Sequence, residues 1–377
     1  MESLRIHVDK AVLDDLKSRL ARTRFVEQIE GTGWEYGIPT DYLRELVEYW
    51  RADYDWRAHE AGLNELEHYR ERIDGQAIHF VHARAGDQTA LPLLLTHGWP
   101  GSVVEFLGVL SPLAEPEAHG GSPRDAFHVV APSLPGYGFS EPARTRGWDP
   151  WRIAAAFVDL MGRLGYPRYV AQGGDWGAQV ATRIAALDPQ HCVAIHLNMP
   201  LAERPDDPVT LSDDDKADLA AIAAFAQEES GYALEQSTRP QTVGAALNDS
   251  PAGLLAWIVE KFQAWSDCQG DPENVVTRDQ LLTNVMTYWV TATAASSARL
   301  YWELRHAGPD RKAPTYVEVP TGVARYPKEV IRYPRSWVER RYNVTYWSNQ
   351  PRGGHFAAME QPELFVNDLR AFFRQAR

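Results

Sequence analysis

Apolar runs alternate with amphipathic helical patterns along residues 91–187, and this alternation constrains the fold more than any other feature. The segments LPLLLTHGWPGS, starting at Leu91, and FHVVAPSLPGYGFS, starting at Phe127, each open with an apolar run and continue into glycines and prolines. Such runs are typical of parallel strands that are covered on both faces. Helical patterns lie near Val103–Leu113 and in WRIAAAFVDLMGRLG. The alternation predicts an α/β fold with a mostly parallel central sheet and helices on both faces.

The limits of this alternation predict four segments. Residues 1–90 form an N-terminal lead-in, and residues 91–199 form the first part of the sheet domain. Residues 200–312 are rich in helical patterns and lack a convincing buried strand, so we expect a helical lid there. A strand pattern returns in residues 313–377, which complete the sheet domain and end in a helix.

The lead-in is predicted to contain two amphipathic helices, around Lys10–Arg22 and Thr40–Ala52, followed by a strand near Ile78–Ala83. Tryptophan and tyrosine are dense in this segment, as in GTGWEYGIP and LVEYWRADYDW. Aromatic side chains bury large apolar areas. We therefore expect them to hold the lead-in against the core and the lid.

Charge and cysteine content exclude several classes of function. The formal net charge is −13, and no concentrated basic patch is present, so a nucleic-acid partner is not expected. The two cysteines, Cys192 and Cys268, suit a reducing compartment, and no Cys/His spacing resembles a zinc site. Met1–Leu20 carries charges throughout and lacks the apolar run of a signal peptide.

The longest stretch without charge is Gln280–Ala298, which is crowded with Thr, Ser, Asn and Gln. These polar residues favour one buried helix in a globular domain over a membrane span. We therefore expect a cytoplasmic protein that needs neither a membrane nor a metal ion.

The segment AQGGDWGA contains the spacing Gly173-x-Asp175-x-Gly177, which has the form of a nucleophile elbow. In an elbow, a tight turn between a strand and a helix exposes one side chain at the carboxyl edge of the sheet, and small residues avoid clashes there. The helix that follows offers free N–H groups and the positive end of its dipole, which stabilise a carboxylate. The alternative interpretation of Asp175 is an ordinary helix cap.

Three other features favour a catalytic role for Asp175: a loop that offers a second backbone amide, a histidine placed to act as a base, and an acid that can orient this histidine. The loop His97–Pro100 (HGWP) follows a buried strand, so the backbone amide of Trp99 is expected to face that of Trp176 and form an oxyanion hole. We interpret His97 itself as a hydrogen-bonded organiser of this loop. His355, in GGHFAAMEQPELF, lies on a loop before the last helix, where the general base of this arrangement is expected.

An acid is needed to orient His355. Glu329, in RYPKEV, lies at the end of a predicted strand, where a carboxylate can hold the imidazole tautomer. Asp310, in a GPD turn, is the competing candidate.

Taken together, these segments resemble the epoxide hydrolases of the α/β-hydrolase fold, on the microsomal-type branch. The resemblance covers nearly the whole chain, and the membrane-bound members' N-terminal anchor is not expected here. It rests on HGWPGS, PSLPGYGFS, QGGDWG, TRPQTVGAALNDSPAGLLAWIVEKF, RLYWE and GGHFAAMEQPE.

The resemblance implies hydrolysis of an epoxide to a vicinal diol through an alkyl ester on Asp175, with water activated by His355 and Glu329. It also implies that two lid tyrosines, Tyr232 and Tyr301, donate to the epoxide oxygen. No cofactor is implied. The expected partners are a small epoxide and water, and a homodimer is compatible with the acidic surface.

Two alternatives remain open at this point. A haloalkane dehalogenase also uses an Asp nucleophile followed by a Trp, but a lid with tyrosines and the HGWP loop count against it. A hydrolase-fold protein that binds without turnover is the other alternative, and the intact set of nucleophile, base and acid counts against it.

Overall fold

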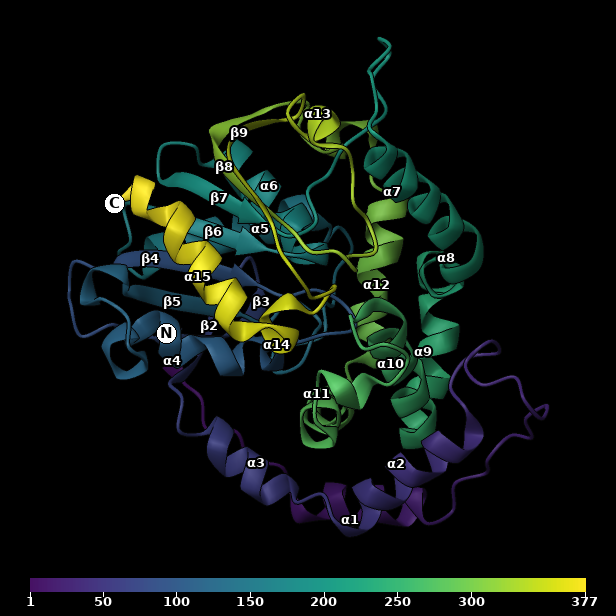
Figure 1. Ribbon diagram of the computed structural model, residues 1–377. Coiled ribbons are helices and arrows are strands. Elements are labelled where there is room, and N and C mark those ends of the chain that lie inside the picture. The colour runs from purple at the N-terminus through teal and green to yellow at the C-terminus, as the bar shows by residue number, and fades with distance from the viewer.

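A nine-stranded sheet forms the centre of the protein, as described by a computed structural model covering residues 1–377 (Figure 1). In the order in which they lie across the sheet, the strands are β1 (Glu2–Ser3), β2 (His68–Ile73), β3 (Gln76–Ala83), β5 (Phe127–Pro132), β4 (Leu91–Thr96), β6 (Tyr169–Gly173), β7 (Cys192–Leu197), β8 (Val317–Arg325) and β9 (Tyr342–Asn349).

The six strands from β5 to β9 run parallel, and β1, β2 and β3 join them by antiparallel pairing. Every residue of β4 and β5 is buried, which confirms the expectation of strands covered on both faces. The carboxyl ends of parallel strands meet at one edge of the sheet. The loops that follow β4, β6, β8 and β9 therefore converge there. They carry, in that order, Trp99, Asp175, Glu329 and His355.

Helices cover both faces of the sheet. On one face, α4 (Leu107–Ala114) and α15 (Pro362–Phe373) share a core with Leu93 and Leu95 of β4. On the other face, α5 (Pro150–Arg163) and α6 (Asp175–Leu187) share a core with Leu94. Alternate side chains of one strand thus point into two separate cores, as the period of a strand requires. Two short helices, α13 (Arg335–Val338) and α14 (Ala357–Glu360), lie in the loops around the last strand.

A helical lid is inserted between β7 and β8 and lies beside the sheet (Figure 1). None of the helices combines the length and the apolar composition that a membrane span requires. The lid helices are α7 (Asp213–Ala224), α8 (Gly231–Thr238), α9 (Pro240–Asp249), α10 (Pro251–Trp265), α11 (Arg278–Thr291) and α12 (Ala294–Arg305).

The single buried helix predicted over Gln280–Ala298 is wrong, because the chain breaks there between α11 and α12. Ala292 adopts a left-handed conformation with φ of 52°. Asn248 of α9 stabilises the break by donating to the carbonyl of Ala292 at 3.1 Å and accepting from the amide of Ala295 at 3.3 Å. A contact from another helix therefore sets the boundary, which is why the local sequence did not reveal it.

The N-terminal segment folds into α1 (Lys10–Leu20), α2 (Thr40–Ala52) and α3 (Trp56–Leu63), which pass below both the sheet and the lid in Figure 1. Tyr49 donates to Asp279 of the lid at 2.8 Å, and the hydroxyl of Tyr54 lies 3.0 Å from that of Thr283. The aromatic residues of this segment therefore hold it against the lid, as expected.

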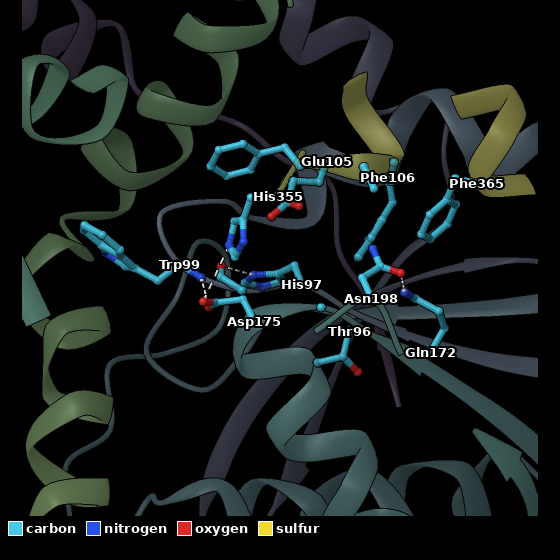
Figure 2. A pocket seen from close by; sticks show the side chains of 15 residues that line it. Thr96, His97, Trp99, Glu105, Phe106, Gln172, Asp175, Asn198, His355 and Phe365 are labelled. Atoms are coloured by element: carbon cyan, nitrogen blue, oxygen red, sulfur yellow. Dashed lines mark hydrogen bonds and ion pairs between the residues drawn. The ribbon is translucent and has the colours of Figure 1, made fainter. Parts of the chain in front are cut away.

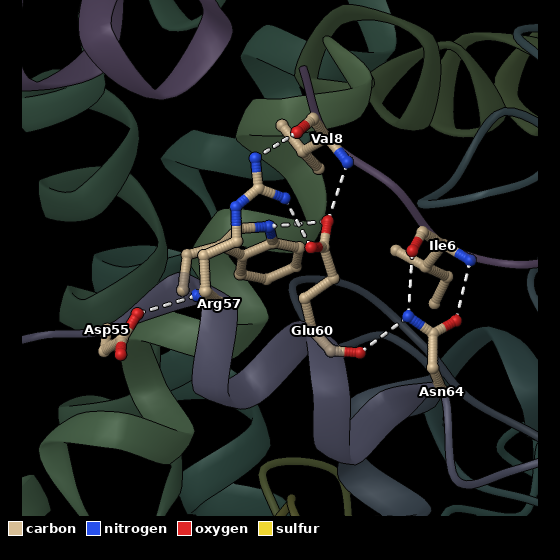
Figure 3. A network of polar contacts seen from close by, with 7 residues as sticks. Ile6, Val8, Asp55, Arg57, Glu60 and Asn64 are labelled. Carbon is tan, nitrogen blue, oxygen red and sulfur yellow. Dashed lines mark hydrogen bonds and ion pairs between the residues drawn. The ribbon is translucent and has the colours of Figure 1, made fainter. Parts of the chain in front are cut away.

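Polar side chains of α3, and of Asn64 directly after it, fix the extended start of the chain (Figure 3). Asn64 pairs with both the amide and the carbonyl of Ile6 at 2.8 Å, in the manner of a strand partner. Glu60 accepts from the amide of Val8 at 2.6 Å, and Arg57 donates to the Val8 carbonyl at 2.5 Å. These contacts satisfy backbone groups that would otherwise be buried without partners.

Candidate active site

Asp175 lies in a sharp turn between β6 and α6, at the carboxyl edge of the sheet. Its φ of 49° is unusual for a residue with a side chain, and such strain persists only where the surrounding structure enforces it. A Cβ atom on Gly173 would come within 2.1 Å of the carbonyl carbon of Gly177, and one on Gly177 within 2.0 Å of the Thr96 carbonyl oxygen. The two glycines are therefore required by the packing of the turn, which has the geometry of a nucleophile elbow.

The backbone amide of Trp99 donates to Oδ1 of Asp175 at 2.9 Å. Gly98 allows this approach, because a Cβ atom there would lie 2.4 Å from Oδ1. Burial raises the pKa of Asp175, while His355 and the amides of Trp99 and Trp176 oppose that rise. The two amides proposed from the sequence thus both act on this carboxylate.

His355 lies between Asp175 and Glu329, the predicted nucleophile and acid. Its Nδ1 lies 2.6 Å from Oε1 of Glu329, and its Nε2 lies 3.6 Å from Oδ2 of Asp175. Burial lowers the pKa of His355, but Glu329 and, more weakly, Asp175 raise it to about 9. Glu329 is buried, whereas Asp310 is exposed in a surface turn, so the structure brings only Glu329 of the two candidate acids to the histidine.

A second buried carboxylate holds the loop of His355, and sequence reasoning missed it. Oε2 of Glu360 accepts from the amides of Gly354 at 3.0 Å and Asp267 at 2.8 Å, while Oε1 accepts from the amide of Phe356 at 2.9 Å. Asp267 follows the lid helix α10, so one carboxylate clamps the base loop to the lid. Gly354 and Phe356 lie in the same loop as Glu360, but Asp267 lies in a distant segment, so no short pattern could have revealed the contact with the lid.

The lid supplies Tyr232 from α8 and Tyr301 from α12. The ring of Tyr232 stacks on Trp99 with centroids 4.9 Å apart, and the ring of Tyr301 meets Trp99 edge-on at 5.9 Å. The centroids of the two tyrosine rings are also 5.9 Å apart. Burial and the Asp175 carboxylate raise the pKa of both phenols. Both therefore stay protonated and can donate hydrogen bonds near the nucleophile.

Other lid aromatics frame this region. Trp265 lies 5.1 Å from the ring of Tyr232 and 5.0 Å from that of His355, and Phe262 stacks on Phe356 at 3.9 Å. Figure 2 shows Trp99 extending from the site toward the lid helices.

His97 acts as an organiser of its loop, as predicted. Its Nδ1 lies 2.8 Å from the Gly98 carbonyl oxygen, and its Nε2 accepts from the amide of Leu134 at 3.1 Å. Burial lowers the pKa of His97 to about 4, so the ring is neutral at pH 7. Its hydrogen bonds fix the loop that carries Trp99.

A small cavity of about 20 Å³ adjoins the nucleophile and the base, and it has room for one water molecule. Four polar side chains that the sequence did not single out line it: Thr96, Glu105, Gln172 and Asn198 (Figure 2). The Nε2 of Gln172 donates to Oδ1 of Asn198 at 3.2 Å, and Gln172 Oε1 is buried without a partner. The site can therefore hold a water molecule beside Asp175 and His355.

Comparison with known proteins identifies two family models in the chain. Residues 1–106 match "Epoxide hydrolase N terminus", and residues 92–244 match "alpha/beta hydrolase fold". The chain is 52% identical over 375 residues to a protein of Stigmatella aurantiaca named "Putative epoxide hydrolase", with 99% of this chain and 84% of that protein covered. It is 39% identical to epoxide hydrolase 1 of Sus scrofa, with 96% and 86% covered.

Solved structures agree with these relatives. The Aspergillus niger epoxide hydrolase superposes with a TM-score of 0.89 at 32% identity, covering 100% of this chain and 96% of that one. The juvenile hormone epoxide hydrolase of Bombyx mori superposes with a TM-score of 0.91 at 33% identity, covering 100% and 95%.

Proposed function

Since the chain belongs to the epoxide hydrolase family, we propose that it opens epoxides through a covalent ester on the carboxylate of Asp175. A serine nucleophile requires an acyl carbon, which an epoxide lacks. A carboxylate can instead attack a strained ring carbon from behind, so that the carbon–oxygen bond of the ring breaks as the ester bond forms. The product of this step is an alkyl-enzyme with an alkoxide on the neighbouring carbon.

The ring oxygen leaves as an alkoxide and needs a hydrogen-bond donor or a proton. Tyr232 and Tyr301 supply two phenolic donors from the lid. The raised pKa values keep both phenols protonated, and their rings pack against Trp99 of the oxyanion loop. These observations support a role for both tyrosines as donors to the ring oxygen of an epoxide bound beside Asp175.

Hydrolysis then releases the diol. His355 takes one proton from water at Nε2 while the water oxygen attacks Cγ of Asp175. The carbonyl oxygen becomes an oxyanion beside the amides of Trp99 and Trp176. When the intermediate collapses, the ester bond breaks and the proton on His355 passes to the departing diol oxygen. The second proton of the water molecule passes to the alkoxide left by ring opening, so that Asp175 returns as a carboxylate and the product is a neutral diol. Glu329 orients the imidazole throughout.

One observation carries this assignment: Asp175 accepts from the Trp99 amide through Oδ1 while its Oδ2 faces Nε2 of His355 at 3.6 Å. The carboxylate is thus presented to an oxyanion donor and to a base at once. An ester formed on this side chain would keep both neighbours, as the hydrolytic step requires.

The His355→Gln variant tests the assignment, because glutamine cannot accept the proton from water. After reaction with styrene oxide, we expect intact-protein mass to increase by the mass of one epoxide, and peptide mapping to place it on Asp175. The Asp175→Asn variant should show no adduct, and the exposed-histidine control His119→Gln should turn over normally. Absence of adduct in His355→Gln would contradict the covalent mechanism.

The dehalogenase alternative is tested with the wild-type protein. Diols from epoxides and halide from 1-bromobutane are measured side by side, and we expect diols alone. The cytoplasmic location predicted from the sequence stays a prediction, and the homodimer stays an option that the acidic surface leaves open.

A further inference from the structure

Glu105 is a third carboxyl group at the catalytic site, beside those of Asp175 and Glu329. It lies in the short helical turn Val103–Phe106 that follows the HGWPGS loop. Its side chain folds back over Gly101, where a Cβ atom would lie 1.5 Å from Oε1. Figure 2 shows its carboxyl group directed toward His355, while Trp99 extends to the lid on the other side of that ring.

Glu105 also borders a second, larger cavity. A cleft of about 560 Å³ lies between α3, α4, α11 and α14. Glu105 and Ala358 line both this cleft and the small cavity beside Asp175. These two residues therefore form the wall between the catalytic site and the cleft, which explains why Glu105 is half-buried while its carboxyl group faces the triad.

The order of the reaction requires a path by which water reaches Asp175 while the substrate is still bound. In the ester intermediate, the alkyl group of the substrate occupies the space between Asp175 and the lid tyrosines. One water molecule must still reach Cγ of Asp175 in every turnover. Water that enters from the lid side would have to pass the bound alkyl group, whereas only Glu105 and Ala358 stand between the cleft and the small cavity.

We propose that Glu105 is a positioning residue for the hydrolytic water, which enters from the cleft and passes its carboxyl group to reach the ester on Asp175. This proposal rests on the covalent mechanism given above. A carboxyl group suits the role, since it can both accept hydrogen bonds from water and, when protonated, donate them. Burial raises the pKa of Glu105 to about 8, with His355 opposing and Asp175 adding to the rise. A neutral group there avoids a third negative charge around one imidazole.

Single-turnover kinetics with styrene oxide test the proposal, because formation and decay of the alkyl-enzyme can be followed separately by rapid quenching and intact-protein mass. In Glu105→Leu, we expect decay to slow by at least about tenfold, while formation stays within about twofold. Glu105→Gln keeps hydrogen-bonding groups and should retain most of the decay rate. A general loss of structure would slow both formation and decay, and glutamine at position 105 would not restore the decay rate.

A second variant leaves the catalytic site untouched. Gly108 lines the cleft on an exposed part of α4, and a Cβ atom there meets nothing within 4 Å. Gly108→Trp should fill the cleft and slow ester decay severalfold without affecting ester formation. Glu65→Leu, an exposed position on the same cleft, is the control and should change neither rate.

The outcomes are distinguishable. Unchanged decay in both Glu105→Leu and Gly108→Trp would overturn the route, and so would equal slowing of formation and decay. If Glu105→Leu does not fold, the rate of ester decay in Gly108→Trp alone tests the route. Absence of any alkyl-enzyme in the wild type would instead overturn the covalent mechanism itself.

Discussion

His355 and Asp175 face each other with Nε2 and Oδ2 3.6 Å apart, while Nδ1 of the same imidazole lies 2.6 Å from Glu329. The histidine thus forms a hydrogen bond with Glu329, whereas its distance to Asp175 is too long for one. Between two carboxylates, the imidazole is held in its charged form, with its pKa raised to about 9 despite burial. Formation of the ester removes the charge of Asp175, so the pKa of His355 must fall in the intermediate and free the imidazole to act as a base.

This coupling predicts a pH dependence for hydrolysis of the ester. The base must be unprotonated, so the single-turnover rate of ester decay should rise with pH and level off. The apparent pKa should lie below the value of about 9 in the free enzyme, because the alkylated Asp175 no longer stabilises the imidazolium. Stopped-flow measurement of ester decay between pH 5 and pH 10 checks this.

Glu329→Gln should shift this profile to lower pH, since the carboxylate is the main group that raises the pKa of His355. It should also reduce the plateau rate by at least about tenfold, because the imidazole loses the partner that fixes its tautomer. An unchanged profile in this variant would show that Glu329 is not the orienting acid.

Tyr232→Phe and Tyr301→Phe should each slow ester formation by about 10²-fold, as the loss of one preorganised donor does in other enzymes. The double variant should nearly abolish it, because the alkoxide then has no donor from the lid. Ester decay should change far less than formation. Formation at the wild-type rate in the double variant would refute the assignment of these tyrosines.

Gly177→Ala should destabilise the protein by about 1–3 kcal/mol, because the new Cβ would lie 2.0 Å from the Thr96 carbonyl oxygen. Gly162→Ala is the matched control within α5, where a Cβ meets nothing within 4 Å. It should be neutral or stabilising by up to about 1 kcal/mol, since alanine favours the helix. Urea denaturation of both variants measures the difference.

Glu360→Gln replaces one acceptor oxygen with a donor that would face a backbone N–H. We expect a loss of about 1–3 kcal/mol of stability and slower ester decay, because the loop on either side of His355 is held by this carboxylate. Glu363→Gln, at an exposed position on α15, should change neither property. Equal behaviour of the two variants would show that the clamp has no role in placing the base.

Strands buried on both faces could be predicted from local sequence, because their apolar character leaves a continuous signal. The Leu91–Thr96 strand has the predicted boundaries. Three strands were not predicted. β1 has only two residues, and β2 reads HYRERI and joins the sheet by antiparallel pairing, so its polar residues obscure the strand pattern. β7 reads CVAIHL and is as long as β4 and β5, and nothing in its sequence explains the omission.

Site residues divide in a similar way. Asp175 and His355 lie in turns that contain glycines, and these glycine patterns can be recognised in the sequence. Glu105 is not identifiable in this way, because it lies far from His355 in the chain. Glu360 is not identifiable either, because its contact with the amide of Asp267 depends on how the lid packs. Only the folded structure shows that four carboxyl groups surround or support one imidazole.

The central claim is that the side chain of Asp175 becomes esterified and is freed by hydrolysis at its own carbon. A single turnover in H₂¹⁸O with enzyme in excess tests this most directly. The covalent account predicts a first diol that contains only ¹⁶O from the enzyme carboxylate and the epoxide, with ¹⁸O recovered in the peptide that carries Asp175. Incorporation of ¹⁸O into that first diol, with an unlabelled peptide, would contradict it.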